Sequence, residues 1–337
     1  MTKYLVICCL LTTIAGTSVR GSESGSPDIA SSLVQAGLVL DGSDATQADA
    51  AAVEAKPADA KPVDDKSADA APDQPKPCAG VTFSRGLKYR ENDQNVLDVA
   101  SSDSRGAASR PVLLFVAGES FAGENGIPDF TGPLQDVAMC FAARNAMVGV
   151  RMAYRLAPDN PWPGGAKDVA AAIAWIHENI DLFGGNSDEI IAVGYSAGAS
   201  HVASYLAHPE FQLSGPGVAG VVLVSGIYRL GADASDAEKA YFGVDASKYE
   251  ERSAFPGIVH VEAPILLAWS VLDPPHLIAQ GEKLKEFLCS VPAHCPHTKV
   301  LDSREGLHSV FSFDISNDSL AGATIELVRE IEARGLP

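Results

Sequence analysis

Positive charge is scarce in this chain of 337 residues, which has 25 lysines and arginines against 43 aspartates and glutamates and a formal net charge of −18. Nucleic acids and anionic membrane surfaces attract basic proteins, so this balance argues against either one as a partner. After the first sixteen residues, the sequence also lacks any apolar run long enough to span a bilayer. We therefore expect neither a nucleic-acid-binding protein nor a protein with several membrane spans.

Residues 22–77 lack aromatic side chains and any sustained apolar periodicity. The segment is rich in Ala, Asp, Lys, Pro and Ser, and its eleven acids against four lysines carry −7 of the net charge. A segment of this composition cannot bury enough apolar surface to offset the entropy lost on ordering. We expect a disordered linker that solubilises the protein or holds it away from a surface.

The chain begins with a single lysine, Lys3, followed by about a dozen mostly apolar residues and then by small residues such as Ala15 and Gly16. This order is typical of a secretory signal peptide, which we assign to residues 1–21. The apolar part is too short to span a bilayer stably, although a retained membrane anchor is the alternative interpretation. A signal peptide predicts an exported protein, either periplasmic or secreted.

Six cysteines are present, and removal of the signal peptide would leave four. An even number in an exported chain favours disulfides. Cys289 and Cys295 flank a turn-like segment and form the natural pair, which leaves Cys78 to pair with Cys140. The alternative is four free, partly buried thiols.

Residues 78–337 have a length that suits one α/β domain with a full core. Apolar, β-branched runs alternate with amphipathic ones, which predicts a mostly parallel, doubly wound sheet flanked by helices, with active-site loops at the carboxyl ends of the strands. Strands are expected at 81–89, 95–99, 111–117, 147–154, 189–194, 218–225, 264–271 and 298–301, the first two as an antiparallel pair. Helices are expected at 131–143, 165–182, 199–207, 277–288 and 320–333.

The central motif is Gly-x-Ser-x-Gly at residues 194–198, which follows an apolar, β-branched run and precedes small residues. In such a strand-to-helix turn the serine takes a strained backbone angle, and its glycine neighbours let strand and helix approach closely. The turn would lift the Ser196 hydroxyl out of the sheet edge and aim the Ala197 N–H at an oxyanion. A bland turn of small residues is the alternative.

A nucleophilic serine needs a base, and the base needs a carboxylate that orients it; in an elbow-type enzyme they follow in the order serine, acid, histidine. Asp273 stands just past the predicted strand at 264–271 and is followed by two prolines. His308 lies in the predicted loop between the last strand and the last helix. The other seven histidines either precede Asp273, follow it too closely, or flank Cys295. We therefore predict a triad of Ser196, His308 and Asp273, although Asp273 alternatively starts a proline turn or caps a helix.

Several further motifs accompany the triad: Tyr-Arg-Leu-Ala-Pro at 154–158, Pro-Trp-Pro at 161–163, Phe-Gly-Gly-Asn at 183–186, Ser-Gly-Ile-Tyr at 225–228 and Asp-Pro-Pro at 273–275. With the Ser196 elbow, this set resembles the α/β-hydrolase esterases, and the nearest branch looks like the feruloyl-esterase, kynurenine-formamidase and hormone-sensitive-lipase group. The resemblance runs from Leu87 to the C-terminus. It implies the α/β-hydrolase fold, no cofactor or metal, and hydrolysis of carboxylic esters or related acyl bonds through an acyl-enzyme.

One segment departs from this group, whose members usually carry His-Gly-Gly-Gly after the third strand. Here the matching residues are Ala-Gly-Glu-Ser at 117–120. The backbone N–H groups of Gly118, Glu119 and Ser120, with that of Ala197, could still form the oxyanion hole, but the Glu119 carboxylate would oppose a developing negative charge if it faced the site. Phe121, which follows, lines the acyl pocket or packs in the core.

We therefore expect an exported serine carboxylesterase that acts on small ester substrates, since the segment between residues 225 and 262 leaves room only for a small lid. The first alternative is an amidase, such as an aryl-formamidase, or a peptidase. The second is a hydrolase-fold binding protein whose altered oxyanion loop has lost turnover. The sequence leaves the oligomeric state and the identity of the substrate open.

Overall fold

The strands in the middle of the sheet are apolar at nearly every position, as expected for strands buried on both faces. The computed structural model describes residues 78–102, 109–118, 121–122, 133–212, 215–302 and 319–335. Within them, eight strands form one sheet in the order β1-β2-β4-β3-β5-β6-β7-β8. They are β1 (Val81–Lys88), β2 (Val96–Ser102), β3 (Arg110–Val116), β4 (Val148–Met152), β5 (Gly185–Tyr195), β6 (Gly220–Val224), β7 (Ile265–Ser270) and β8 (His297–Leu301).

The sheet is parallel except at its beginning, where β2 runs antiparallel to both β1 and β4. The predicted antiparallel opening pair and the predicted mostly parallel sheet are thus confirmed. Three neighbouring strands are paired near their ends: Tyr195 at the end of β5 pairs with Val224 at the end of β6, and Val224 pairs with Ala268 of β7. The residues that follow β5, β6 and β7 therefore emerge side by side at one edge of the sheet.

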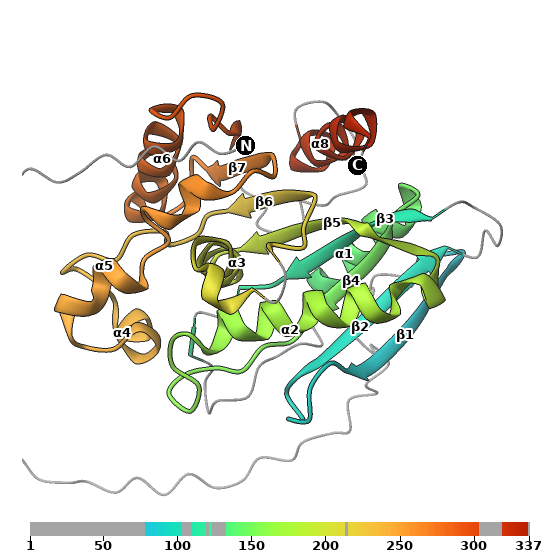
Figure 1. Cartoon of the computed structure of the whole chain (residues 1–337), viewed down its shortest axis with the longest axis horizontal. Coiled ribbons are helices and arrows are strands. Elements are labelled where there is room, and N and C mark those ends of the chain that lie inside the picture. The colour runs from blue at the N-terminus through green and yellow to red at the C-terminus, as the bar shows by residue number, and fades with distance from the viewer. Residues whose placement is uncertain are drawn as a thin grey trace, which may run out of the picture. The chain divides into compact units, whose positions relative to one another are not determined.

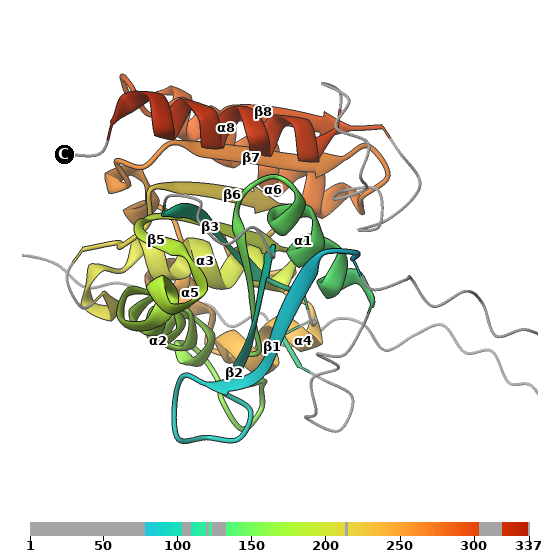
Figure 2. The same cartoon turned by 90° about the vertical axis from the view of Figure 1, so that its right-hand side faces the viewer.

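Helices cover both faces of the sheet, and alternate residues of each strand point to opposite sides. One core contains residues of α2, α3 and α6 with Val112 and Leu114 of β3, and the other contains residues of α1 and α8 with Leu113 and Phe115 (Figure 1). Helix α8 lies along β6, β7 and β8 (Figure 2). The α-helices are α1 (Pro133–Arg144), α2 (Gly164–Asn179), α3 (Ala197–Ala207), α4 (Asp236–Phe242), α5 (Tyr249–Arg252), α6 (Pro275–Cys289) and α8 (Leu320–Arg334). The 3-10 helices are η2 (Ile180–Phe183), η3 (Pro209–Phe211), η4 (Ala246–Lys248) and η5 (Gly257–His260).

The segment between β6 and β7 contains only short helices, α4 and α5 together with η4 and η5, none of which the sequence pattern predicted. Helix α4 begins with a capping box in which the Ser235 hydroxyl accepts from the Glu238 N–H and the Glu238 carboxylate accepts from the Ser235 N–H. The aromatic residues Tyr241 and Phe242 at its end are buried. They pack in a third cluster with Phe121, which lies near the predicted oxyanion loop in sequence.

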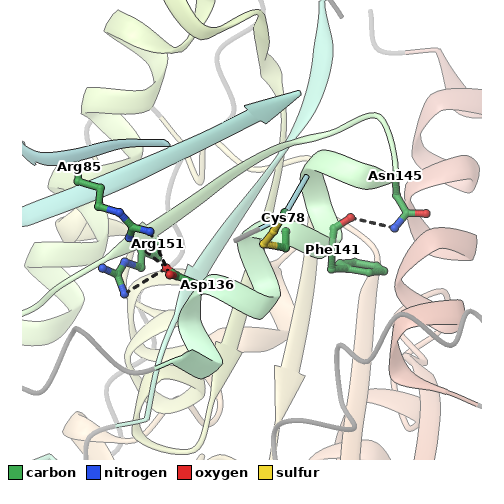
Figure 3. The surroundings of a disulfide bond; sticks show 7 residues. Cys78, Arg85, Asp136, Phe141, Asn145 and Arg151 are labelled. Carbon is green, nitrogen blue, oxygen red and sulfur yellow. Dashed lines mark hydrogen bonds and ion pairs between the residues drawn. A yellow bond between two sulfur atoms is a disulfide. The ribbon is translucent and has the colours of Figure 1, made fainter. Parts of the chain in front are cut away.

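Helix α1 is fastened to the sheet by a disulfide and by an ion network. Cys140 in α1 is bonded to Cys78, whose Cα lies 5.9 Å away. Figure 3 shows Arg85 and Arg151 directed toward Asp136 of α1. Arg85 donates to both carboxylate oxygens of Asp136, each at 3.0 Å.

The second predicted disulfide, between Cys289 and Cys295, is also present, with a Cα–Cα distance of 3.9 Å. It closes the turn that connects α6 to β8. Both predicted pairings are thus confirmed. None of the helices in the described part of the chain has the length and hydropathy needed to cross a membrane. The predicted signal peptide and linker lie outside the described residues.

Candidate active site

Ser196 stands at the junction of β5 and α3 with φ +51° and ψ −121°, a backbone conformation that residues with a Cβ rarely adopt. Its N–H donates to Val224 O of β6 at 2.8 Å, which holds the strained turn in place. The side chain makes no capping hydrogen bond to α3 and is partly exposed, whereas every residue of α3 is buried. The turn therefore places Ser196, partly exposed, at the carboxyl edge of the sheet.

The two glycines of the motif allow strand and helix to meet. A Cβ on Gly194 would lie 2.5 Å from Ala199 Cα, and one on Gly198 would overlap the carbonyl oxygens of Val116 and Ala117. Larger residues at either position would push α3 away from β3 and β5. The sequence argument for these glycines is confirmed.

Gly118, just beyond the end of β3, lies directly against the serine. A Cβ on this residue would be 2.6 Å from Ser196 Cβ and 2.8 Å from Tyr195 O. Ala197, at the N-terminus of α3, is 2% exposed. Two of the predicted oxyanion residues thus lie next to Ser196, Gly118 in space and Ala197 in the chain. Glu119 and Ser120 lie outside the described residues.

Phe121 is 5% exposed and has φ +62°. Its ring stacks on Tyr241 with a centroid distance of 5.4 Å and meets Phe242 and His201 edge-on. Its carbonyl accepts from Ala157 N–H at 3.0 Å, which ties the chain after the oxyanion loop to the Tyr-Arg-Leu-Ala-Pro motif. Phe121 therefore packs in a buried cluster beside the elbow, and its predicted role in the acyl pocket stays a prediction.

Asp273 follows β7 and is half-buried. Two donors converge on its Oδ2 atom: Ser225 Oγ at 2.6 Å and the Ser270 N–H at 2.9 Å. The Asp273 N–H in turn donates to Ser270 O at 3.1 Å. These bonds fix the carboxylate at the end of β7, and none of the hydrogen bonds within the described chain uses Oδ1.

The charge of Asp273 affects two nearby tyrosines. Burial raises the pKa of Tyr195, and the negative charge of Asp273 raises it further. Burial also raises the pKa of Tyr228 strongly, with a smaller contribution from Asp273, although the hydrogen bond from the Gly226 N–H opposes it. Both phenols are therefore neutral at neutral pH.

His308 lies outside the described residues, between the end of β8 at Leu301 and the start of α8 at Leu320. His201, which the order of residues excluded as the base, is 1% exposed and lies among the rings of Phe121, Tyr154 and Tyr241. Burial lowers the pKa of His201 to about 3, and neither ring nitrogen has a hydrogen-bond partner among the described residues. A ring in this position has no access to an ester at Ser196.

Sequence reasoning gave no role to Ser225, the residue after β6, which is 5% exposed and has φ +52°. The available signal was its position: it follows β6 just as Ser196 follows the neighbouring strand β5. In the Tyr-Arg-Leu-Ala-Pro motif, the partly exposed Arg155 guanidinium donates to both oxygens of the buried Asp168 carboxylate.

The sheet order, the strained elbow after β5 and the acidic residue after β7 are those of the α/β-hydrolase fold. Solved structures support this fold. Esterase B from Lactobacillus rhamnosis superposes with a TM-score of 0.60 at 18% identity, covering 76% of this chain and 86% of that one. A thermostable esterase from Pseudomonas putida ECU1011 gives a TM-score of 0.58 at 17% identity, covering 77% and 85%.

The model of the carboxylesterase family matches residues 55–239, more than half of the chain, and the chain belongs to this family. Esterase LipC of Mycobacterium tuberculosis is 30% identical over 187 residues, which are 51% of this chain and 45% of the relative. Para-nitrobenzyl esterase of Bacillus subtilis is 34% identical over 150 residues, 40% of this chain and 29% of the relative. The chain thus spans half or less of the length of these relatives.

Proposed function

We propose that this protein is a serine carboxylesterase that cleaves small carboxylic esters through an acyl-enzyme. The observation that carries the proposal is the strained Ser196 turn, which has Gly118 packed directly against it and is followed by Ala197, the first residue of α3. Family membership and the esterases among the relatives support the same reaction.

In the proposed reaction, Ser196 Oγ attacks the ester carbonyl carbon while His308 takes the hydroxyl proton. The tetrahedral intermediate collapses when the bond to the leaving alcohol breaks, and His308 passes the proton to that alcohol. Water, activated by the same histidine, then attacks the acyl-enzyme and releases the carboxylic acid and free Ser196. No redox step and no co-reactant other than water is needed.

Asp273 orients His308 in this proposal. Because Ser225 and the Ser270 N–H both donate to Oδ2, that oxygen is occupied and the carboxylate cannot rotate without losing both bonds. Oδ1 is then the oxygen that accepts from the imidazole. A carboxylate in this role holds the ring in the right tautomer and stabilises the imidazolium that forms during the reaction.

The oxyanion would be bound by backbone N–H groups of Ala197 and of the loop that contains Gly118, Glu119 and Ser120. Such donors stabilise the transition state because they point at the site before charge develops. The close contact of Gly118 with Ser196 supports this position for the loop. A Glu119 carboxylate that faced the oxyanion would oppose the developing negative charge and favour the binding-protein alternative. A Glu119 carboxylate that pointed away would leave an efficient esterase.

We propose small substrates because the segment between β6 and β7 adds only short helices, α4 and α5 with η4 and η5, beside the site.

Within the α/β-hydrolase esterases, we propose membership of the feruloyl-esterase, kynurenine-formamidase and hormone-sensitive-lipase group. The Tyr-Arg-Leu-Ala-Pro motif of that group has a structural role here. Its Arg155 pairs with Asp168, and its Ala157 N–H donates to Phe121 O. These contacts support the assignment.

We further propose that the protein is exported, with residues 1–21 as a signal peptide and residues 22–77 as a linker to the hydrolase domain at 78–337. The two disulfides support export, since disulfides persist mainly in oxidising compartments.

The test of the activity is release of p-nitrophenol from p-nitrophenyl acetate and butyrate by the full chain and by Ser196→Ala. We expect turnover by the wild type and its loss in the variant. Equal rates in the two proteins would overturn the proposal. Hydrolysis of N-formyl aromatic amines without hydrolysis of esters would instead establish the amidase alternative.

A further inference from the structure

The turn after β6 is held almost entirely by side chains. Ser225 is its first residue, and the backbone N–H groups of the next five residues each donate to a side-chain oxygen. The acceptors are Tyr228 Oη for Gly226 (3.2 Å), Ser200 Oγ for Ile227 (2.8 Å), Gln280 Oε1 for Tyr228 (3.0 Å) and Arg229 (2.9 Å), and Ser253 Oγ for Leu230 (3.0 Å). A turn whose backbone donors are all satisfied by fixed side chains has one preferred conformation.

Gln280 of α6 contributes most to this arrangement. Its Oε1 accepts from two consecutive N–H groups, and its Nε2 donates to Arg229 O at 2.7 Å. Of the described side chains that accept from the N–H groups of this turn, only Gln280 lies on α6. This helix begins two residues after Asp273. One side chain therefore links the turn of Ser225 to the helix that follows the acid.

The neighbouring residue fixes α6 against the sheet. A Cβ on Gly281 would lie 2.6 Å from the ring of Trp269, so helix and strand approach as closely as a glycine allows. Trp269 is on β7, and the chain runs from it through Ser270 to Asp273. Gly281 thus sets the distance from α6 to β7, while Gln280 sets the distance from α6 to the turn after β6.

These two contacts fix both ends of the hydrogen bond between Ser225 Oγ and Asp273 Oδ2, which is only 2.6 Å long. A shift of the turn relative to α6 would lengthen that bond and let the carboxylate move. We propose that Gln280 is a positioning residue for the Asp273 carboxylate and acts through Ser225. This inference rests on the proposed function, in which Asp273 orients the catalytic base.

The experiment is a double-mutant cycle of Gln280→Leu and Ser225→Ala. The readouts are kcat and KM for p-nitrophenyl butyrate and the rate at which a fluorophosphonate probe labels Ser196. In the wild-type background, we expect Gln280→Leu to lower kcat and the labelling rate ten- to a hundredfold, on the order of what a small misplacement of catalytic groups costs. KM should stay within about twofold, since the substrate contacts are unchanged.

In the Ser225→Ala background, the same substitution should change kcat by less than about twofold, because the bond through which it acts is already absent. Equal losses in both backgrounds, or no loss in the wild-type background, would overturn the inference. Ser253→Ala is the matched control: it removes another acceptor of the same turn that is not on α6, and it should leave kcat within about threefold. Should Gln280→Leu not fold, Gln280→Glu loses the donor to Arg229 O but still accepts from both N–H groups, and it must retain more activity than Gln280→Ala, which loses all three bonds.

A wild type that neither turns over esters nor reacts with the probe would contradict the proposed function rather than the link made by Gln280. That link is then measured by amide hydrogen exchange. Gln280→Leu must speed exchange both in residues 226–230 and in residues 270–273. Faster exchange in 226–230 alone would overturn the inference.

Discussion

Ser225 Oγ donates to Asp273 Oδ2 at 2.6 Å, which joins the residue after β6 to the loop after β7. Ser225 also follows β6 where Ser196 follows β5, since Tyr195 and Val224 are paired in the register. The strained serine of the elbow, a second strained serine and the acid therefore emerge from three neighbouring strands. Both serines have positive φ values, +51° and +52°, so the surrounding structure holds each in a conformation that residues with a Cβ rarely adopt.

The first prediction concerns this second serine. Ser225→Ala should lower kcat for p-nitrophenyl butyrate by ten- to a hundredfold with KM nearly unchanged, because a hydrogen bond to a charged group contributes about 1.5–3 kcal/mol. Steady-state kinetics measure the effect. Ser204→Ala, which removes a buried hydroxyl that accepts from Trp162 instead, is the control and should keep kcat. If the two variants had the same kcat, Ser225 would not position the acid.

The second prediction concerns Gly118. Gly118→Ala would place a methyl group 2.6 Å from Ser196 Cβ and 2.8 Å from a backbone carbonyl oxygen, neither of which can move freely. The loop must shift, and we expect kcat to fall by about two to three orders of magnitude, the loss that follows removal of one oxyanion donor. Gly164→Ala is the control, since its new Cβ would meet only the Asn160 side chain, at 3.3 Å. Full activity of Gly118→Ala would mean that the loop does not contribute to the oxyanion hole.

The third prediction concerns pH and stability. Burial lowers the pKa of His201 from 6.5 to about 3, so the unfolded state binds a proton on this residue between these pH values and the folded state does not. The stability that depends on neutral His201 is therefore fully present above about pH 6.5 and is lost as the pH falls toward 3. From pH 6.5 to 4.5, this loss is on the order of 2–3 kcal/mol.

His201→Leu should remove that part of the pH dependence, because leucine does not titrate. Urea unfolding at pH 4.5 and 7 gives the free energy of unfolding for each variant. The exposed His260 provides the control His260→Gln, which should keep the wild-type dependence on pH. A His201→Leu protein that loses as much stability on acidification as the wild type would contradict the assignment.

The sequence predicted the features that depend on local pattern. The β-branched run at 190–193 and the glycines at 194 and 198 are enough to predict the elbow, since strand burial and close approach leave few alternatives for such residues. The cysteine pairing also followed from the sequence, because Cys289 and Cys295 are close in the chain and only Cys78 and Cys140 remained.

Features that depend on contacts between distant segments were not predictable in this way. The bond of Ser225 to Asp273 spans 48 residues, and that of Gln280 to Arg229 spans 51, so neither leaves a periodic signal. Helices α4 and α5 were missed because they are short and are stabilised by packing of Tyr241, Phe242 and Tyr249 rather than by a long amphipathic pattern. Local signals define the elements, and the contacts among them define the site.

The central claim is that Ser196 is a nucleophile activated by the rest of the site. The most direct measurement is covalent labelling with a fluorophosphonate, followed by peptide mass spectrometry to locate the modified residue. The account predicts one adduct per chain, on Ser196, with loss of fluoride, no adduct in Ser196→Ala and much slower labelling in Asp273→Asn. An unlabelled wild type, or an adduct on another residue that persists in Ser196→Ala, would contradict it.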